Sequence, residues 1–350
     1  MQVKQWDVIV VGGGIIGLSL AIALDKRGLK PLIVERGEPG REATHAAGGM
    51  LAAADVEPHS PLLPLAQASA ALYPEFVHEL QDESGLNVDL RDQGTIVLHP
   101  ADAQRRCAVE PSRPLGELEP GLSLGQADAI FLRERSVDPR LLAAAALAAV
   151  NHRGIDMVSG SEVIEVSRSA GSLTVRTAHT TYTAGLVVNC AGSWAGQIPT
   201  LSLPVRPVKG QMLSIVGAPS ALRHVIRSPE AYLIPRSDGK VVVGATLEEA
   251  GYDKRTDPDT IKRMFAAAVN LVPALGEGRL HEAWAGLRPG TPDDLPILGP
   301  THMPGYFVAT GHYRDGILLA PITAQVMAAL ILNEPLAYDL APFSPQRFAR

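Results

Sequence analysis

The chain has 350 residues and a formal net charge of −6, with 46% hydrophobic and 19% charged residues. This length predicts about two globular domains with a sizeable core. The acidic balance argues against the basic surface that a nucleic-acid partner requires. Two cysteines, Cys107 and Cys190, lack the number and spacing of a disulfide framework or a metal site, so we expect no metal.

The start of the chain lacks the charged and apolar regions of a signal peptide. The apolar stretch Val8–Ile16 is too short and too rich in glycine to span a membrane. We therefore expect a cytoplasmic protein without stable membrane association.

The first predicted element is Asp7–Gly17, with the sequence DVIVVGGGIIG. Its β-branched run predicts a buried parallel strand, and Ile15–Arg27 predicts the helix that follows. In the pattern GxGxxG, Gly12 allows a tight turn and Gly14 lets the backbone approach a pyrophosphate. Gly17 lets the helix pack closely on the strand. The helix N-terminus then directs its positive dipole end at the phosphates.

Pro31–Glu35 predicts a second strand that ends in a carboxylate, about 20 residues beyond the glycines. Glu35 at that place accepts hydrogen bonds from a ribose and disfavours a 2′-phosphate. The order of strand, glycines, helix, strand and acid predicts dinucleotide binding. It does not separate NAD from FAD, because both carry an adenosine ribose.

Small residues fill Thr44–Gly49. One interpretation is a tight contact between two helices. The other is a second cofactor-contacting turn that lies along the diphosphate and reaches the reactive ring near Gly48, Gly49 and Met50. In the second interpretation Thr44 supplies a hydroxyl to the phosphates.

The middle of the chain alternates between helices and strands. Leu62–Ser84 has the apolar spacing of a helix. Asp138 is predicted as the N-cap of a helix that continues through Leu141–His152. We expect a hairpin over Leu173–Thr183, and then a separate buried strand, Leu186–Gly192, that ends at the cofactor edge of a parallel sheet.

The pattern of apolar residues changes after Pro204. Val205–Ile215 and Tyr232–Val243 alternate with period two and predict an antiparallel sheet. Asp257–Leu271 predicts an amphipathic helix, and the GHYRDG segment Gly311–Gly316 predicts a turn into a final apolar helix. We expect a parallel domain formed by 1–85, 137–200 and 286–350, interleaved with an antiparallel domain formed by 86–136 and 201–285.

Six motifs together resemble the D-amino acid oxidase superfamily of FAD enzymes, and within it the glycine oxidase branch. They are GGGIIG, ATHAAGGML, NCAGSWAG, YLIPR, WAGLRPGTPDDLPILG and ATGHYRDGILLAP. The resemblance runs from residue 7 to about residue 330 and implies a mixed α/β and α+β fold. In that fold a Rossmann-like FAD-binding domain is interleaved with an antiparallel-sheet substrate domain, as in D-amino acid oxidase and the glutathione reductase 2-like fold.

The resemblance implies FAD, held without a covalent link because no cysteine lies near Gly311–Leu318. With the glycine-rich loop included, the expected FAD contacts are Gly12, Gly14, Ile15, Ile16, Gly17, Glu35, Arg36, Ala43, Thr44, Gly48, Gly49, Met50, Val163, Gly192, Gly311, His312, Tyr313, Arg314, Asp315, Gly316, Ile317 and Leu318.

Three residues are implied in substrate binding and orientation. Arg288 matches the arginine that binds the substrate carboxylate, for which a guanidinium supplies two parallel hydrogen bonds. Tyr232 matches a tyrosine beside it, and Arg314 a second pocket arginine. The alternatives are a structural arginine in a buried turn, a core tyrosine and a locally satisfied arginine. Glu230 and Leu247 depart from some relatives and bear on substrate preference.

The implied reaction is oxidative deamination of glycine, sarcosine or small D-amino acids. Its products are glyoxylate or another 2-oxo acid, ammonia or an amine, and hydrogen peroxide from O2. The glycine imine would supply the thiazole of thiamine. A D-amino acid dehydrogenase that reduces a quinone remains an alternative, as do a flavin domain of a larger assembly and an NAD-dependent dehydrogenase. The resemblance also implies a homotetramer, in which Leu62–Ser84 could supply part of an interface.

Overall fold

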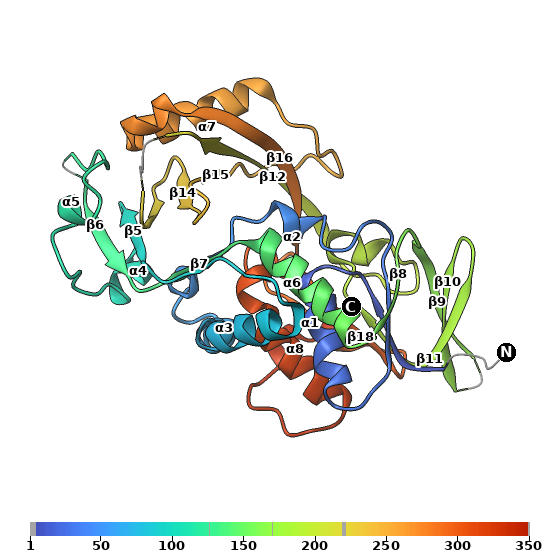
Figure 1. The fold of residues 1–350 in the computed structure, drawn as a ribbon. Coiled ribbons are helices and arrows are strands. Elements are labelled where there is room, and N and C mark those ends of the chain that lie inside the picture. Colours follow the sequence, from blue (N-terminus) through green and yellow to red (C-terminus); the bar gives the residue numbers. More distant parts are fainter. Residues whose placement is uncertain (1–4, 126, 170, 219–221, 349–350) are drawn as a thin grey trace.

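The computed structural model describes residues 5–125, 127–169, 171–218 and 222–348. Two large sheets organise these residues (Figure 1). A small third sheet joins three two- or three-residue strands, β3 (Met50–Leu51), β7 (Arg135–Val137) and β4 (Leu90–Arg91).

The first large sheet contains eight strands of the described chain, with the central order β17-β18-β11-β1-β2-β8. Strands β18, β11, β1, β2 and β8 run parallel, whereas β17, β10 and β9 pair antiparallel. The strands are β1 (Trp6–Val11), β2 (Pro31–Val34), β8 (Asp156–Val158), β9 (Val163–Ser169), β10 (Ser172–Thr177), β11 (Thr181–Asn189), β17 (Ile297–Pro300) and β18 (Tyr306–Thr310).

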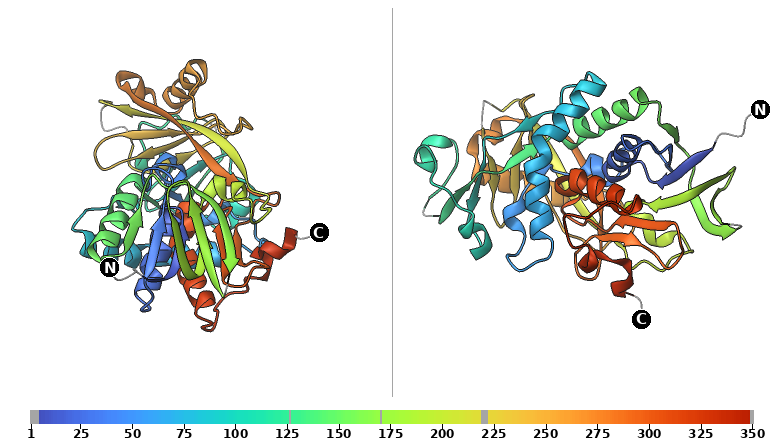
Figure 2. Two further views of the ribbon diagram at one scale, coloured as in Figure 1. Left: turned by 90° about the vertical axis from the view of Figure 1, so that its right-hand side faces the viewer. Right: turned by 90° about the horizontal axis from the view of Figure 1, so that it is seen from below.

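Both faces of β1 are buried, which explains its unbroken apolar run. Val8 and Val10 point into a core shared with four helices, whereas Ile9 and Val11 pack on the other side against β9 and β10. The four helices are α1 (Ile15–Asp25), α3 (Leu63–Ser84), α6 (Pro139–His152) and α8 (Gly316–Ile331), seen together in Figure 2. The predicted Asp138 cap of α6 is confirmed, because its carboxylate accepts from two backbone N–H groups.

The second large sheet contains seven strands in the order β16-β12-β15-β14-β13-β5-β6. All neighbours pair antiparallel except β13 and β5. The amphipathic helix α7 (Pro258–Leu271) packs on it through Ile261, Met264 and Ala268. The strands are β5 (Thr95–Leu98), β6 (Ala129–Leu132), β12 (Arg206–Val216), β13 (Val225–Arg227), β14 (Tyr232–Pro235), β15 (Val241–Gly244) and β16 (Arg279–Gly290).

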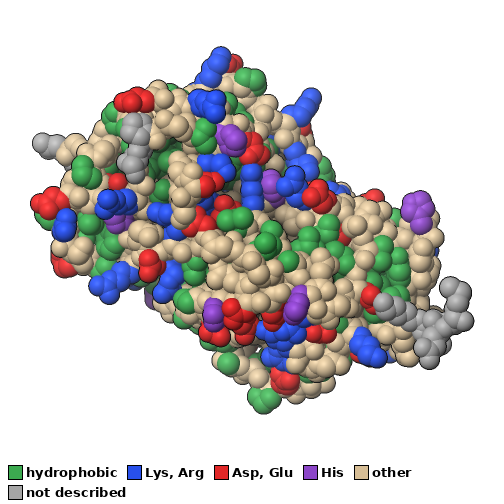
Figure 3. All heavy atoms as spheres, in the orientation of Figure 1, with side chains coloured by type: hydrophobic (Ala, Val, Ile, Leu, Met, Phe, Trp, Pro, Cys, Tyr) green, Lys and Arg blue, Asp and Glu red, His purple; other side chains and the backbone are tan. Residues whose placement is uncertain are grey.

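Short helices connect these layers. The α-helices are α2 (Ala43–Ala46), α4 (Asp102–Arg106) and α5 (Leu115–Leu118), and the 3₁₀ helices are η1 (Ala53–Asp55), η2 (Gly192–Gln197), η3 (Pro273–Glu277), η4 (Ala341–Phe343) and η5 (Pro345–Phe348). On the face shown in Figure 3, acidic and basic side chains are interspersed. No helix in the described ranges has the length and apolar character needed to cross a bilayer.

Two local expectations are wrong. The predicted hairpin strand and the separate strand Leu186–Gly192 are one continuous strand, β11, which pairs with β10 at its start and with β1 and β18 further on. The predicted turn around Arg288 is the end of strand β16, because β12 pairs with that strand along its whole length. Strand β16 crosses the expected domain boundary between residues 285 and 286. The division into domains stays a prediction.

Candidate functional site

The glycine-rich loop joins β1 to α1. Gly12 has φ +110, which only glycine adopts readily. A Cβ at Gly17 would lie 2.0 Å from the Gly12 carbonyl oxygen, so the helix reaches the strand only because Gly17 has no side chain. A Cβ at Gly14, in contrast, would have a single described neighbour within 4 Å, Thr44 Oγ1 at 3.4 Å. Gly14 therefore borders open space.

Two side chains brace this loop. The buried carboxylate of Glu35 accepts from the N–H of Gly13 at 2.7 Å and of Gly37 at 2.8 Å. The Thr44 hydroxyl oxygen accepts from the Ile15 N–H at 3.1 Å, within the first turn of α1. The Thr44 hydroxyl can still donate its own hydrogen, and the Glu35 carboxylate has further lone pairs that can accept. Both side chains therefore keep hydrogen-bonding capacity for a ligand.

A cavity of about 1090 Å³ extends from this loop to the seven-stranded sheet. That volume exceeds the roughly 300–1,000 Å³ typical of a small-ligand pocket. Most of the predicted cofactor residues line it: Gly12, Gly14, Ile15, Ile16, Glu35, Arg36, Ala43, Thr44, Gly48, Gly49, Met50, Val163, Gly192, His312, Tyr313, Arg314, Asp315, Gly316 and Ile317. Gly17, Gly311 and Leu318 are not among the lining residues, because they pack behind the loop and helix ends.

Sequence reasoning predicted Arg36 as a cofactor contact but missed the aromatic side chain beside it. The Arg36 guanidinium carbon lies 3.6 Å from the centre of the Trp194 ring, and both residues line the cavity. The Tyr252 ring lies against the Trp194 ring, with the ring centres 5.5 Å apart, and the Tyr252 hydroxyl donates to the Ser193 carbonyl. The signal in the sequence was Trp194 itself, directly after the small residues that end β11.

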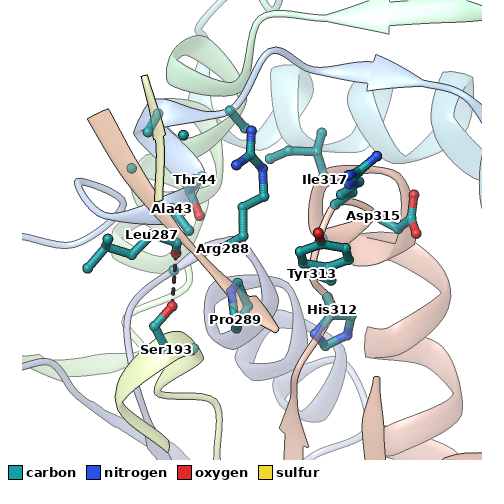
Figure 4. A pocket seen from close by; sticks show the side chains of 18 of the residues that line it. Ala43, Thr44, Ser193, Leu287, Arg288, Pro289, His312, Tyr313, Asp315 and Ile317 are labelled. Carbon is teal, nitrogen blue, oxygen red and sulfur yellow. Dashed lines mark hydrogen bonds between the residues drawn. The ribbon is translucent and has the colours of Figure 1, made fainter. Parts of the chain in front are cut away.

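The far end of the cavity contains Arg288 and Tyr232. Figure 4 shows Arg288 extending from β16 into the space between the Ala43–Thr44 segment and the loop that carries Tyr313. Its Nη1 donates to the Thr246 carbonyl at 3.2 Å, which leaves further N–H groups of the guanidinium available. Burial raises the pKa of Tyr232, against the opposing effect of the Arg288 charge, so its phenol stays protonated.

Two glycines make room for this pair. A Cβ at Gly210 of β12 would lie 2.4 Å from the Arg288 guanidinium nitrogens, and a Cβ at Gly244 would lie 2.4 Å from the Tyr232 ring. Met212 and Met50 pack near Tyr232 and make the surroundings apolar. A charged hydrogen bond is stronger in such surroundings than in water.

The loop before α8 supplies groups of different character. His312 is buried, its Nε2 lies 3.1 Å from Thr323 Oγ1, and burial lowers its pKa to about 3, so it is neutral. Burial, assisted by the nearby carboxylate of Asp55, raises the pKa of Asp315 to about 6. Arg314 is exposed, its guanidinium carbon lies 5.2 Å from the centre of the Tyr313 ring, and its charge opposes the rise in the pKa of Asp315.

The two positions that depart from relatives differ in placement. Leu247 lines the cavity and is 57% exposed. Glu230 is exposed, its carboxylate accepts from Ser228 Oγ at 2.9 Å, and it is not among the lining residues. Among the residues placed by the structure, no cluster of three or more His, Cys, Asp or Glu side chains is arranged to hold a metal ion.

Residues 7–330 match the family of FAD dependent oxidoreductases termed DAO. The chain belongs to this family. The FAD-dependent oxidoreductase assignment confirms the predicted cofactor and replaces the NAD-dependent alternative. This assignment also agrees with the geometry of the site. The glycine-rich loop, the N-terminus of α1 and the buried Glu35 form one end of a cavity that is larger than a small substrate needs.

Known relatives are similar in sequence over nearly the whole of this chain. A glycine oxidase of Geobacillus kaustophilus is 34% identical over an alignment that covers 98% of this chain and 97% of that protein. The bifunctional protein ThiO/ThiG of Synechocystis is 35% identical over 98% of this chain, which spans 54% of that longer protein. The crystal structure of glycine oxidase from Geobacillus kaustophilus matches with a TM-score of 0.94 and 32% identity, over 99% of this chain and 100% of that chain. This match confirms the predicted fold class.

Proposed function

We propose that this FAD-dependent oxidoreductase oxidises glycine and other small amino acids, including sarcosine and small D-amino acids. The products would be glyoxylate or another 2-oxo acid, ammonia or an amine, and hydrogen peroxide. When bound, FAD would accept a hydride from the substrate Cα and pass the electrons to O2, and water would hydrolyse the resulting imine to the 2-oxo acid and the ammonia or amine. The observation that carries the proposal is a guanidinium beside a phenol at the cavity end opposite the glycine-rich loop.

Arg288 is proposed to bind the substrate carboxylate. A guanidinium presents a planar fork of donors that matches the two carboxylate oxygens. Its bond to the Thr246 carbonyl restricts the guanidinium, so less conformational freedom is lost when substrate binds. Tyr232, protonated and adjacent, would donate one further hydrogen bond to the same carboxylate.

The cofactor is proposed to lie with its phosphates at Gly12–Ile16 and its ribose at Glu35. Its adenine would lie near Val163, and its reactive ring between Gly48–Met50 and His312–Ile317. Apart from Gly13, all of these residues line the same cavity. Arg314 is proposed to act at the pocket mouth, because it is exposed there while still lining the cavity.

The names of the relatives add the biological context. Two of them are called glycine oxidase or ThiO/ThiG, which supports a role in forming the thiazole of thiamine. A homotetramer and a cytoplasmic location stay predictions, to be tested by light scattering and by cell fractionation.

The test is peroxide release by the purified yellow protein under air, with glycine, sarcosine and D-alanine compared at equal concentration. Peroxide formed with glycine supports the proposal. Bleaching of the flavin by D-alanine without peroxide would instead favour a dehydrogenase that reduces a quinone.

A further inference from the structure

Helix α8 begins at the cavity and contains a proline that removes one donor from its backbone hydrogen bonds. Pro321 lies inside the helix and has no backbone N–H. In an unbroken helix that N–H would donate to the carbonyl of Ile317, four residues earlier. Ile317 lines the cavity and is itself buried, so its carbonyl cannot turn to bulk water for a partner.

Helix α3 supplies the missing donor. The hydroxyl of Tyr73 donates to the Ile317 carbonyl, and Tyr73 is 0% exposed. Burial raises the pKa of Tyr73 far above its ordinary value, so the hydroxyl remains a donor at every physiological pH. A tyrosine hydroxyl in an apolar core would otherwise be a buried polar group in need of a partner.

A second side chain of α3 contacts the next step of the same helix. Ser69 Oγ donates to the Leu318 carbonyl at 2.6 Å and lies 3.4 Å from the Ile322 N–H. Ser69 is also 0% exposed. One turn of α3 therefore forms hydrogen bonds with the backbone of α8 on both sides of Pro321.

We propose that Tyr73 and Ser69 are positioning residues that hold the first turn of α8, Gly316–Leu318, at the location required by the flavin ring. The proposal rests on the placement of the flavin given above. The first turn of a helix carries unpaired N–H groups and partial positive charge, which favour the more negative, reduced flavin. Its position therefore influences both FAD affinity and flavin reduction potential.

The chain contains a matched control for this arrangement. Helix α3 has an internal proline of its own, Pro74, which frees the carbonyl of Ala70. Arg135 Nη1 approaches that carbonyl at 3.4 Å, and neither Ala70 nor Arg135 lines the cavity. Loss of this contact changes α3 without touching the first turn of α8.

The experiment compares Tyr73→Phe, Ser69→Ala and Arg135→Gln in the full chain. The readouts are the Kd for FAD, measured by titrating the apoprotein, the flavin reduction potential and the Tm. We expect Tyr73→Phe to weaken FAD binding about tenfold, as the loss of one buried hydrogen bond allows. We also expect it to lower the potential, and Ser69→Ala to act in the same direction with a smaller effect. Arg135→Gln should leave Kd and potential unchanged.

Pro321→Ala provides the decisive background, because it restores the N–H that Ile317 lacks. In that background Tyr73→Phe should change the Kd for FAD less than twofold, since the new N–H replaces the lost donor. Equal losses in both backgrounds would overturn the proposal. If Pro321→Ala fails to fold, a Tyr73→Phe protein with lower Tm but unaltered Kd and potential would overturn it equally. None of the three readouts uses amino-acid turnover, so failure of glycine to react would refute the proposed function without deciding this inference.

Discussion

The two ends of the cavity are built from different parts of the protein. At the end proposed for the phosphates, most of the groups that line the cavity are backbone atoms of one stretch, Gly12–Ile16, joined by the Glu35 carboxylate and the Thr44 hydroxyl. At the end proposed for substrate, the contacting groups are the side chains of Arg288 and Tyr232, carried by strands β16 and β14.

This difference determines what each end depends on. The glycine loop requires only that one strand be followed by one helix without intervening side chains. The substrate end requires the correct register between strands far apart in sequence, because Val208 of β12 lies opposite Arg288 and Gly210 lies two residues along. A slip of one residue would turn Arg288 to the other face of the sheet.

The largest effects are expected at the glycine loop, where one glycine is needed for the protein's own packing and another for the space proposed for the cofactor. Gly17→Val should prevent folding, because even its Cβ would lie 2.0 Å from the Gly12 carbonyl. Gly14→Val should fold but purify without colour, since its side chain would fill the space proposed for the pyrophosphate. Circular dichroism and the flavin absorbance of each variant measure the two outcomes. A yellow, fully loaded Gly14→Val protein would contradict the placement of the phosphates.

At the other end, Arg288→Ala should keep its flavin and lose turnover. Removal of the partner of a desolvated carboxylate costs about 2–5 kcal/mol, or roughly 30-fold to several-thousand-fold in kcat/KM. Steady-state kinetics with glycine and the ratio of flavin to protein are the measurements, with Arg288→Lys as the variant that retains the charge. Near-normal kinetics for Arg288→Ala would remove this residue from the substrate site.

A smaller effect should follow from filling the space beside Arg288. Gly210→Ala places a methyl group 2.4 Å from the guanidinium nitrogens, so the arginine must move. We expect kcat/KM to fall about tenfold with unchanged flavin content, because overpacking costs ~1–3 kcal/mol. The matched control is Gly185→Ala, whose Cβ would meet its nearest neighbour at 3.7 Å. Equal kinetics in the two variants would show that the arginine does not need this space.

A further effect depends on pH and concerns Asp315, at the start of α8. Its pKa is about 6 in the folded protein against an ordinary value of 3.8, so the folded state holds the proton more tightly than the unfolded state. The stability from this protonation is present below the unfolded pKa and is lost as the pH rises through about 6. Asp315→Asn cannot ionise and should therefore be stabilised relative to the native chain above about pH 6.

Urea unfolding of both apoproteins between about pH 4 and pH 8 measures this difference. A difference in unfolding free energy that does not vary with pH would mean that Asp315 titrates normally.

Local chemistry explains which elements the sequence predicts well. The cap at Asp138 needs only its own carboxylate and the next two N–H groups, and it is present as expected. Helix α3 begins and ends within one residue of its predicted bounds, because its apolar spacing and the terminal Gly85 are local signals. Strand β11 was divided because its two ends pair with different partners, a fact that no local pattern records.

The sequence by itself therefore determined the dinucleotide loop, because turn, glycines and helix terminus are contiguous and their geometry follows from backbone rules. It also contained the residues of the substrate end, as a resemblance to known enzymes implied. Only the tertiary structure decided that Gly210 and Gly244 clear space for Arg288 and Tyr232, and that Tyr73 bonds the helix that contains Pro321. These contacts join residues far apart along the chain, and their existence depends on how sheets and helices pack.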